Sequence, residues 1–227
     1  MKNKMGRLML LLLSIAPFVL TAMALKYFPE KIPTHYDFSG NIDAFGSKNS
    51  QYVLAAVFSI SGLVMFIISE CVRKIHNKEE EDTVKAQNNA NIINKIGIGL
   101  MILFIVMQGS ELLNVYYYIN NKGDFPDLKI TNIALMSLMV YAGNVIAKSK
   151  MNSALGIRTS WSFKSEKAWS VSQRSGGKAM IITSILMIIA ALILPEAYQI
   201  ILLFSGVILV TGSSLIVSYR AVKKMDD

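Results

Sequence analysis

Six long apolar blocks constrain the fold of this 227-residue chain more than any other feature of its sequence. A helix needs about 20 apolar residues to cross a hydrocarbon core, and the blocks have this length. Membrane β-strands would alternate apolar and polar residues, which these blocks do not do. We therefore predict an all-α integral membrane protein, a bundle of about six transmembrane helices. The blocks are Leu8–Leu25, Tyr52–Ser69, Ile96–Ile119, Ile130–Ala147, Ala179–Leu194 and Tyr198–Tyr219.

The distribution of lysine and arginine predicts the orientation. Of the 23 basic residues, 18 lie in the N-terminus, in the stretches 70–95 and 148–178, or in the C-terminal tail. Because positive residues collect on the cytoplasmic side of membranes, we predict that both termini and these two stretches are cytoplasmic. The stretches 26–51 and 120–129 would then lie outside, and Pro195–Glu196 would form a tight outer turn. The net charge of +8 reflects this rule rather than nucleic-acid binding.

We expect the chain to divide into two regions. Residues 1–95 would hold two helices with the outer loop 26–51 and the charged inner loop 70–95. Residues 96–227 would hold four helices with the inner loop 148–178. The charged and amide-rich residues 77–94 fit either a solvated loop or an extension of the following helix.

The first apolar block has an alternative interpretation. Basic residues precede it, and Ala22-Met23-Ala24 resembles the cleavage site of a signal peptide. Its apolar run reaches Leu25, which is long for a signal sequence, so an uncleaved anchor is the preferred interpretation.

The chain carries no recognisable catalytic motif. The common nucleophile, zinc and phosphate-loop patterns are missing. The two histidines, His35 and His76, are predicted to lie on opposite sides of the membrane and so cannot share a site. The single cysteine, Cys71, excludes an internal disulfide. We therefore expect neither an enzyme nor a bound cofactor or metal.

A polar stripe interrupts the third apolar block. Gln108, Glu111 and Asn114 recur every three residues and therefore lie on one helical face. A carboxylate is costly in lipid, so this face should look into the bundle or a wet cavity. It would serve either as a ligand or proton site, or only in hydrogen bonds between helices. The first possibility suggests a small transporter or exporter.

The inner loop 148–178 combines basic residues with Trp161 and Trp169, which suits the lipid headgroup zone. It would be either an interfacial anchor or a docking surface for a cytoplasmic partner. Ser165 is placed to cap a short helix that starts at Glu166 and ends at Gly176-Gly177.

This loop and the first outer loop resemble the sequence signature of the SdpI family and of the domain that often precedes it. Ser160 and Gln173 depart from the usual pattern, which has proline at the first position and histidine or asparagine at the second. The inner signature is carried by Asn144, Gly156, Arg158, Trp161, Glu166, Trp169 and Arg174, and the outer one by Pro29, Pro33, His35 and Gly40.

The resemblance implies a multi-pass protein of the bacterial cytoplasmic membrane. The best-known family member protects a bacillus from its own secreted peptide toxin. When toxin is present, it also holds a transcriptional repressor at the membrane. The partners so implied are membrane lipids, a peptide toxin outside and a cytoplasmic repressor, with no direct contact to nucleic acid. Arg158 would either anchor the inner loop through carbonyls or headgroups, or contact the partner.

Overall fold

The computed structural model describes residues 2–37, 42–74, 80–123, 125–152 and 155–226. It confirms the predicted bundle, because six helices in this part of the chain are long and apolar enough to cross a membrane. The helices are α1 (Lys2–Ala24), α2 (Gln51–Arg73), α3 (Glu80–Ile119), α4 (Asp127–Ile146), α5 (Glu166–Ile193) and α6 (Gln199–Asp226).

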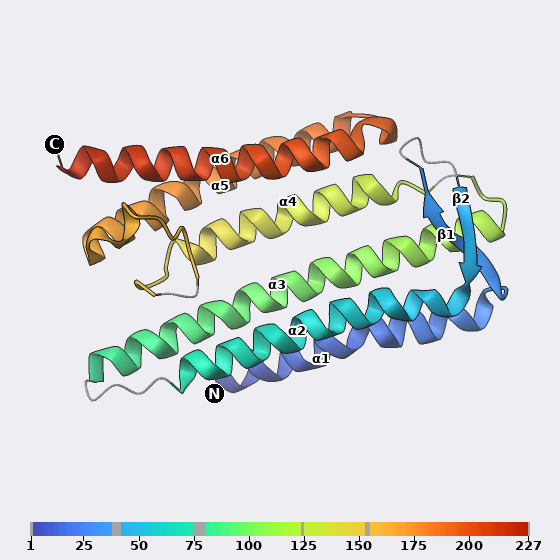
Figure 1. Ribbon diagram of the computed structural model, residues 1–227, viewed down its shortest axis with the longest axis horizontal. Coiled ribbons are helices and arrows are strands. Elements are labelled where there is room, and N and C mark those ends of the chain that lie inside the picture. The colour runs from blue at the N-terminus through green and yellow to red at the C-terminus, as the bar shows by residue number, and fades with distance from the viewer. Residues whose placement is uncertain (1, 38–41, 75–79, 124, 153–154, 227) are drawn as a thin grey trace.

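Helix α3 joins two groups of helices. It packs against α1 and α2 on one side and against α4 on the other, while α5 packs against both α4 and α6 (Figure 1). Both chain ends lie at one end of the bundle, which we term the inner end following the charge distribution. The loop between α1 and α2 lies at the opposite, outer end (Figure 1).

The first outer loop contains a β-hairpin that the sequence analysis did not predict. Strands β1 (Lys31–Tyr36) and β2 (Ile42–Ser47) pair antiparallel, with Ile32 opposite Gly46. Each strand has only six residues, and Pro33 weakens the strand signal. Gly40, which lies between the two strands in the sequence, is outside the described residues.

Two helices are longer than their apolar blocks. Helix α3 begins at Glu80, so the amide-rich stretch before its apolar block is a helical extension rather than a loop. Helix α5 begins at Glu166, as predicted, and the Ser165 hydroxyl accepts a hydrogen bond from the Ala168 N–H at 3.0 Å. The predicted end of this helix was wrong, because α5 runs through Gly176 and Gly177 to Ile193.

Close helix packing explains why these glycines do not end the helix. A Cβ atom on Gly177 would lie 2.6 Å from the carbonyl oxygen of Gly143 in α4. A Cβ on Gly176 would lie 2.2 Å from Ile157 and 2.9 Å from the carbonyl oxygen of Ser214 in α6. The two glycines therefore let the backbones of α4, α5 and α6 approach one another, as small residues do in membrane bundles.

A polar network ties the inner ends of the first three helices together. The Arg7 guanidinium in α1 donates to the Glu70 carboxylate in α2 at 2.7 Å. Arg73 donates to Glu70 at 3.4 Å and to the Asn91 side-chain oxygen in α3 at 3.2 Å. Basic residues that indicated orientation in the sequence thus also join helices.

Candidate functional site

The inner motif region, residues 148–178, is built around one backbone clamp. The buried Gln173 side chain accepts from the Ile157 N–H at 2.7 Å and donates to the Ile157 carbonyl at 2.9 Å. The preceding Gly156 has φ +116°, and a Cβ there would lie 2.6 Å from the Gln173 side-chain oxygen. Glycine is therefore needed for both the backbone conformation and the space.

Both tryptophans fasten the motif region to neighbouring helices. Trp169 is 1% exposed, and its indole N–H donates to the Ser149 carbonyl, just beyond α4, at 3.0 Å. The Trp161 N–H donates to the Ser218 hydroxyl of α6 at 3.0 Å. Its ring meets Tyr219 edge-on, with centroids 5.3 Å apart. The indoles thus bind α4, α5 and α6 into one inner unit.

The charged motif residues lie on the surface. Arg158 and Arg174 are exposed, and within the described part of the chain neither guanidinium has a hydrogen-bonding partner. Glu166 forms an ion pair with Lys85 of α3, which links the helical extension to the start of α5. Asn144 is also exposed, on α4. Anchoring of Arg158 through protein carbonyls is therefore not seen among the described residues.

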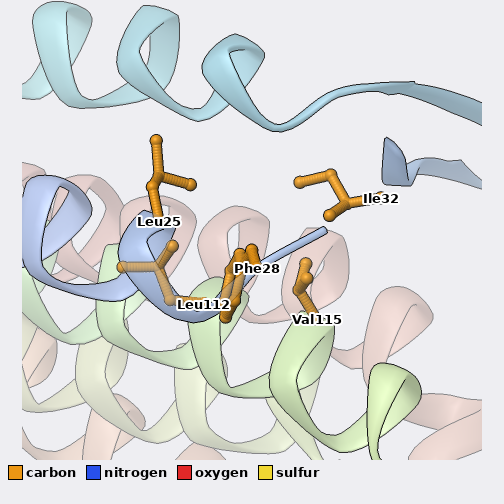
Figure 2. Close-up of a cluster of buried hydrophobic side chains, with 5 residues drawn as sticks. All are labelled: Leu25, Phe28, Ile32, Leu112 and Val115. Atoms are coloured by element: carbon orange, nitrogen blue, oxygen red, sulfur yellow. The ribbon is translucent and has the colours of Figure 1, made fainter. Parts of the chain in front are cut away.

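At the outer end, the hairpin is fastened to α3 by an apolar cluster. Ile32 of β1 is fully buried and packs with Leu112 and Val115 of α3, together with Leu25 and Phe28. Figure 2 shows these five side chains between the chain leaving α1 and helix α3. The cluster holds the hairpin close to Glu111, the residue of α3 that precedes Leu112.

The three described motif residues of the outer loop do not converge on one site. Pro33 is buried in β1, whereas Pro29 and His35 are exposed. The His35 ring nitrogen lies 2.5 Å from the carboxylate of Asp43, across the hairpin. These contacts indicate a role in the shape of the hairpin.

The polar stripe of α3 meets α2 at the outer end. Gln108 is fully buried, and Glu111 and Asn114 are half-buried. The Gln51 amide of α2 donates to the Glu111 carboxylate at 3.4 Å. Both residues line a pocket of about 420 Å³ that also includes Thr34 of β1. Part of the stripe thus opens to the outer end, and part lies inside the bundle.

Two further groups make this end polar. Burial, together with the negative charges of Glu111 and Asp127, raises the pKa of Tyr36 to about 12. The carboxylate of Glu196, in the turn before α6, accepts from the Leu128 and Lys129 N–H groups at 2.9 and 3.1 Å. It therefore caps the start of α4.

No group of three or more metal-binding side chains occurs in the part of the chain that the structure describes.

Sequence reasoning missed the residues that complete these sites. Gln173 was noted only as a departure from the family pattern, and Gln51 and Ser218 were not singled out. Ser214 and Ser218 carried a signal, because polar residues four apart in an apolar helix share a face. Ser214 donates to the Gly176 carbonyl at 3.1 Å, and the Ser218 and Ser172 hydroxyls lie 2.7 Å apart.

Comparison with known proteins finds a family match in the motif region. Residues 148–218 match the SdpI/YfhL protein family. The resemblance to the SdpI family is confirmed. Residues 12–60, which include the hairpin, match a domain of unknown function, DUF1648.

The SdpI resemblance extends over nearly the whole chain. The immunity protein SdpI of Bacillus subtilis (strain 168) is 23% identical over 211 residues, which cover 92% of each protein. No solved structure gives a significant match.

Proposed function

We propose that this protein is a membrane immunity protein of the SdpI type, which protects the producing cell against a secreted antimicrobial peptide toxin. The observation that carries the proposal is the similarity to the immunity protein SdpI over 92% of both chains. No step of this function requires catalysis. The protein would reside in the bacterial cytoplasmic membrane, with its six helices in contact with lipid.

The two ends of the bundle would have different roles. The hairpin and the outer ends of the helices would meet the toxin. The inner motif region would hold a cytoplasmic transcriptional repressor when toxin is bound. The exposed guanidinium groups of Arg158 and Arg174, which have no partner among the described residues, support this role, because arginine is well suited to bidentate contacts with carboxylates on a partner.

A killing assay tests the immunity function. A toxin-sensitive bacillus that lacks its own immunity gene is challenged with the peptide toxin, with and without expression of this protein. Survival should rise on expression. Unchanged killing, with the protein present at normal levels in the membrane fraction, would refute immunity to that toxin.

The signalling role is tested with surface charges. The double variant Arg158→Ala, Arg174→Ala should reach the membrane in normal amounts and still protect, but should lose toxin-dependent induction of an operon reporter. Lys223→Ala, Lys224→Ala removes two charges from the exposed tail of α6 and is the matched control. Equal induction in both double variants would contradict a docking role for the two arginines.

A small transporter is the second candidate function, and the half-buried carboxylate of Glu111 beside an outer pocket favours it. Toxin export by such a protein would require Glu111 to change its partner or its protonation during transport. Glu111→Gln should then abolish export of labelled toxin from loaded vesicles, with unchanged protein content. Protection without measurable export would favour immunity over transport.

A further inference from the structure

The outer pocket beside Glu111 is lined by residues of β1, α2 and α3 and by Ser50, which directly precedes α2. It has a volume of about 420 Å³ and lies at the start of α2, where β1 and α3 meet it. Its apolar wall comes from Val53, Leu54 and Val57 of α2. Its polar groups are the Glu111 carboxylate, the Gln51 amide, and the hydroxyls of Thr34 and Ser50. The pocket therefore pairs one acidic group with an apolar wall.

Within the described part of the chain, the Glu111 carboxylate has no cationic partner. The one hydrogen bond it accepts there is the 3.4 Å contact from Gln51, a neutral amide. Among the described residues, no lysine, arginine or histidine forms an ion pair with it. A half-buried carboxylate with one neutral donor retains acceptor positions that a bound cation would satisfy.

Gln51 provides an independent sign of a ligand. Its side chain is 6% exposed, so it is more than nine-tenths buried. Its amide nitrogen is used by Glu111, but its side-chain oxygen has no hydrogen-bonding partner. An unpaired buried acceptor is costly, so a rearrangement of this pocket residue that brings the Gln51 oxygen to an incoming N–H donor would be favourable.

We propose that this pocket binds one ammonium or guanidinium group carried on an apolar body, namely a basic side chain or the N-terminal amine of an amphipathic peptide. The cation would donate to the Glu111 carboxylate and the Gln51 oxygen, while the apolar body covers Val53 and Val57. The choice of a peptide rests on the proposed function. The pocket itself is tested without any toxin, so its failure is distinguishable from failure of immunity.

The test measures the binding of dansylcadaverine, an amine on an apolar fluorophore, to the full-length protein in phosphatidylcholine nanodiscs. Dansyl fluorescence rises on transfer to an apolar site, and empty nanodiscs give the background. The matched neutral probe is the N-pentyl dansyl amide, which lacks the amine. We expect saturable binding of dansylcadaverine and only background signal from the neutral probe.

Three variants locate the binding. Glu111→Gln should weaken binding at least about tenfold, because it removes a charge-assisted hydrogen bond. Glu30→Gln is the matched control, since its 82% exposed side chain carries an outer negative charge away from the pocket. The affinity of Glu30→Gln for dansylcadaverine should change less than about twofold. Thr34→Lys leaves Glu111 in place and should block the probe with its own ammonium group.

Several results would overturn the proposal. Equal binding by Glu111→Gln and the unaltered protein would do so, as would equal binding of the two probes. If Glu111→Gln fails to fold, as judged by gel filtration, Thr34→Lys decides, because unchanged probe binding by that variant would exclude the pocket. Displacement of the probe by phosphatidylethanolamine in the nanodiscs would assign the site to a lipid headgroup and overturn the peptide assignment.

Discussion

Substitution of Gly156 by alanine tests the backbone clamp of the motif region. An L-residue at φ +116° would carry backbone strain of about 1–3 kcal/mol. Its Cβ would also lie 2.6 Å from the Gln173 oxygen and displace that side chain from Ile157. The two hydrogen bonds of the clamp contribute about 0.5–1.5 kcal/mol each. The variant should therefore lose about 2–6 kcal/mol of stability.

The two components of this loss are separable. Gly123 has φ +82° with no atom within 4 Å of its missing Cβ, so Gly123→Ala reports backbone strain alone. In a Gln173→Ala background the clamp is already lost, and Gly156→Ala should then cost only the backbone strain and the 3.1 Å approach of its Cβ to the Trp169 ring. The assay is SDS-induced unfolding in detergent, followed by tryptophan fluorescence. If Gly156→Ala costs no more than Gly123→Ala in the otherwise unaltered protein, the clamp does not stabilise the motif region.

Three further predictions concern the rest of the bundle. Glu196→Gln should lower the free energy of unfolding by about 1–2 kcal/mol in the same assay, because a carboxylate at the start of α4 is replaced by a neutral amide. An unchanged free energy of unfolding would contradict a capping role. Gly177→Ala should cost about 1–3 kcal/mol, because its Cβ meets the rigid carbonyl of Gly143, whereas Gly212→Ala, with nothing within 4 Å, should be tolerated. Burial raises the pKa of Tyr36 to about 12, so the folded protein favours its neutral form. The contribution of Tyr36 to the free energy of unfolding is therefore complete below pH 10 and is lost as the pH rises toward 12. The stability difference between the unaltered protein and Tyr36→Phe should therefore shrink between these pH values, and a constant difference would refute the shift.

The sequence predicted the helices well because lipid leaves the backbone few options. A buried stretch of backbone must satisfy its hydrogen bonds internally, so long apolar blocks become helices. The continuation of α5 through Gly176 and Gly177 was not predictable on the same basis. A glycine in a helix costs about 1 kcal/mol in isolation, and the backbone approach to Gly143 that favours it is visible only in three dimensions.

The candidate sites were predictable only in part. Periodicity placed Gln108, Glu111 and Asn114 on one face, but the Gln51 partner of Glu111 lies 60 residues away in the chain. The motif residues came from the family resemblance, not from spacing. Gln173 departs from that family pattern, yet it forms the clamp on Ile157, because a long amide can satisfy a backbone donor and acceptor at once.

The unbroken length of α3 has a consequence for communication across the membrane. Lys85, which pairs with Glu166 at the inner end, and Glu111, which faces the outer pocket, lie on the same helix. At 1.5 Å per residue they are separated by about 39 Å along its axis. The segment between them contains no proline, so α3 lacks the commonest cause of a kink. A small tilt of α3 at its outer end would therefore displace the Lys85 contact at the inner end without any intervening loop.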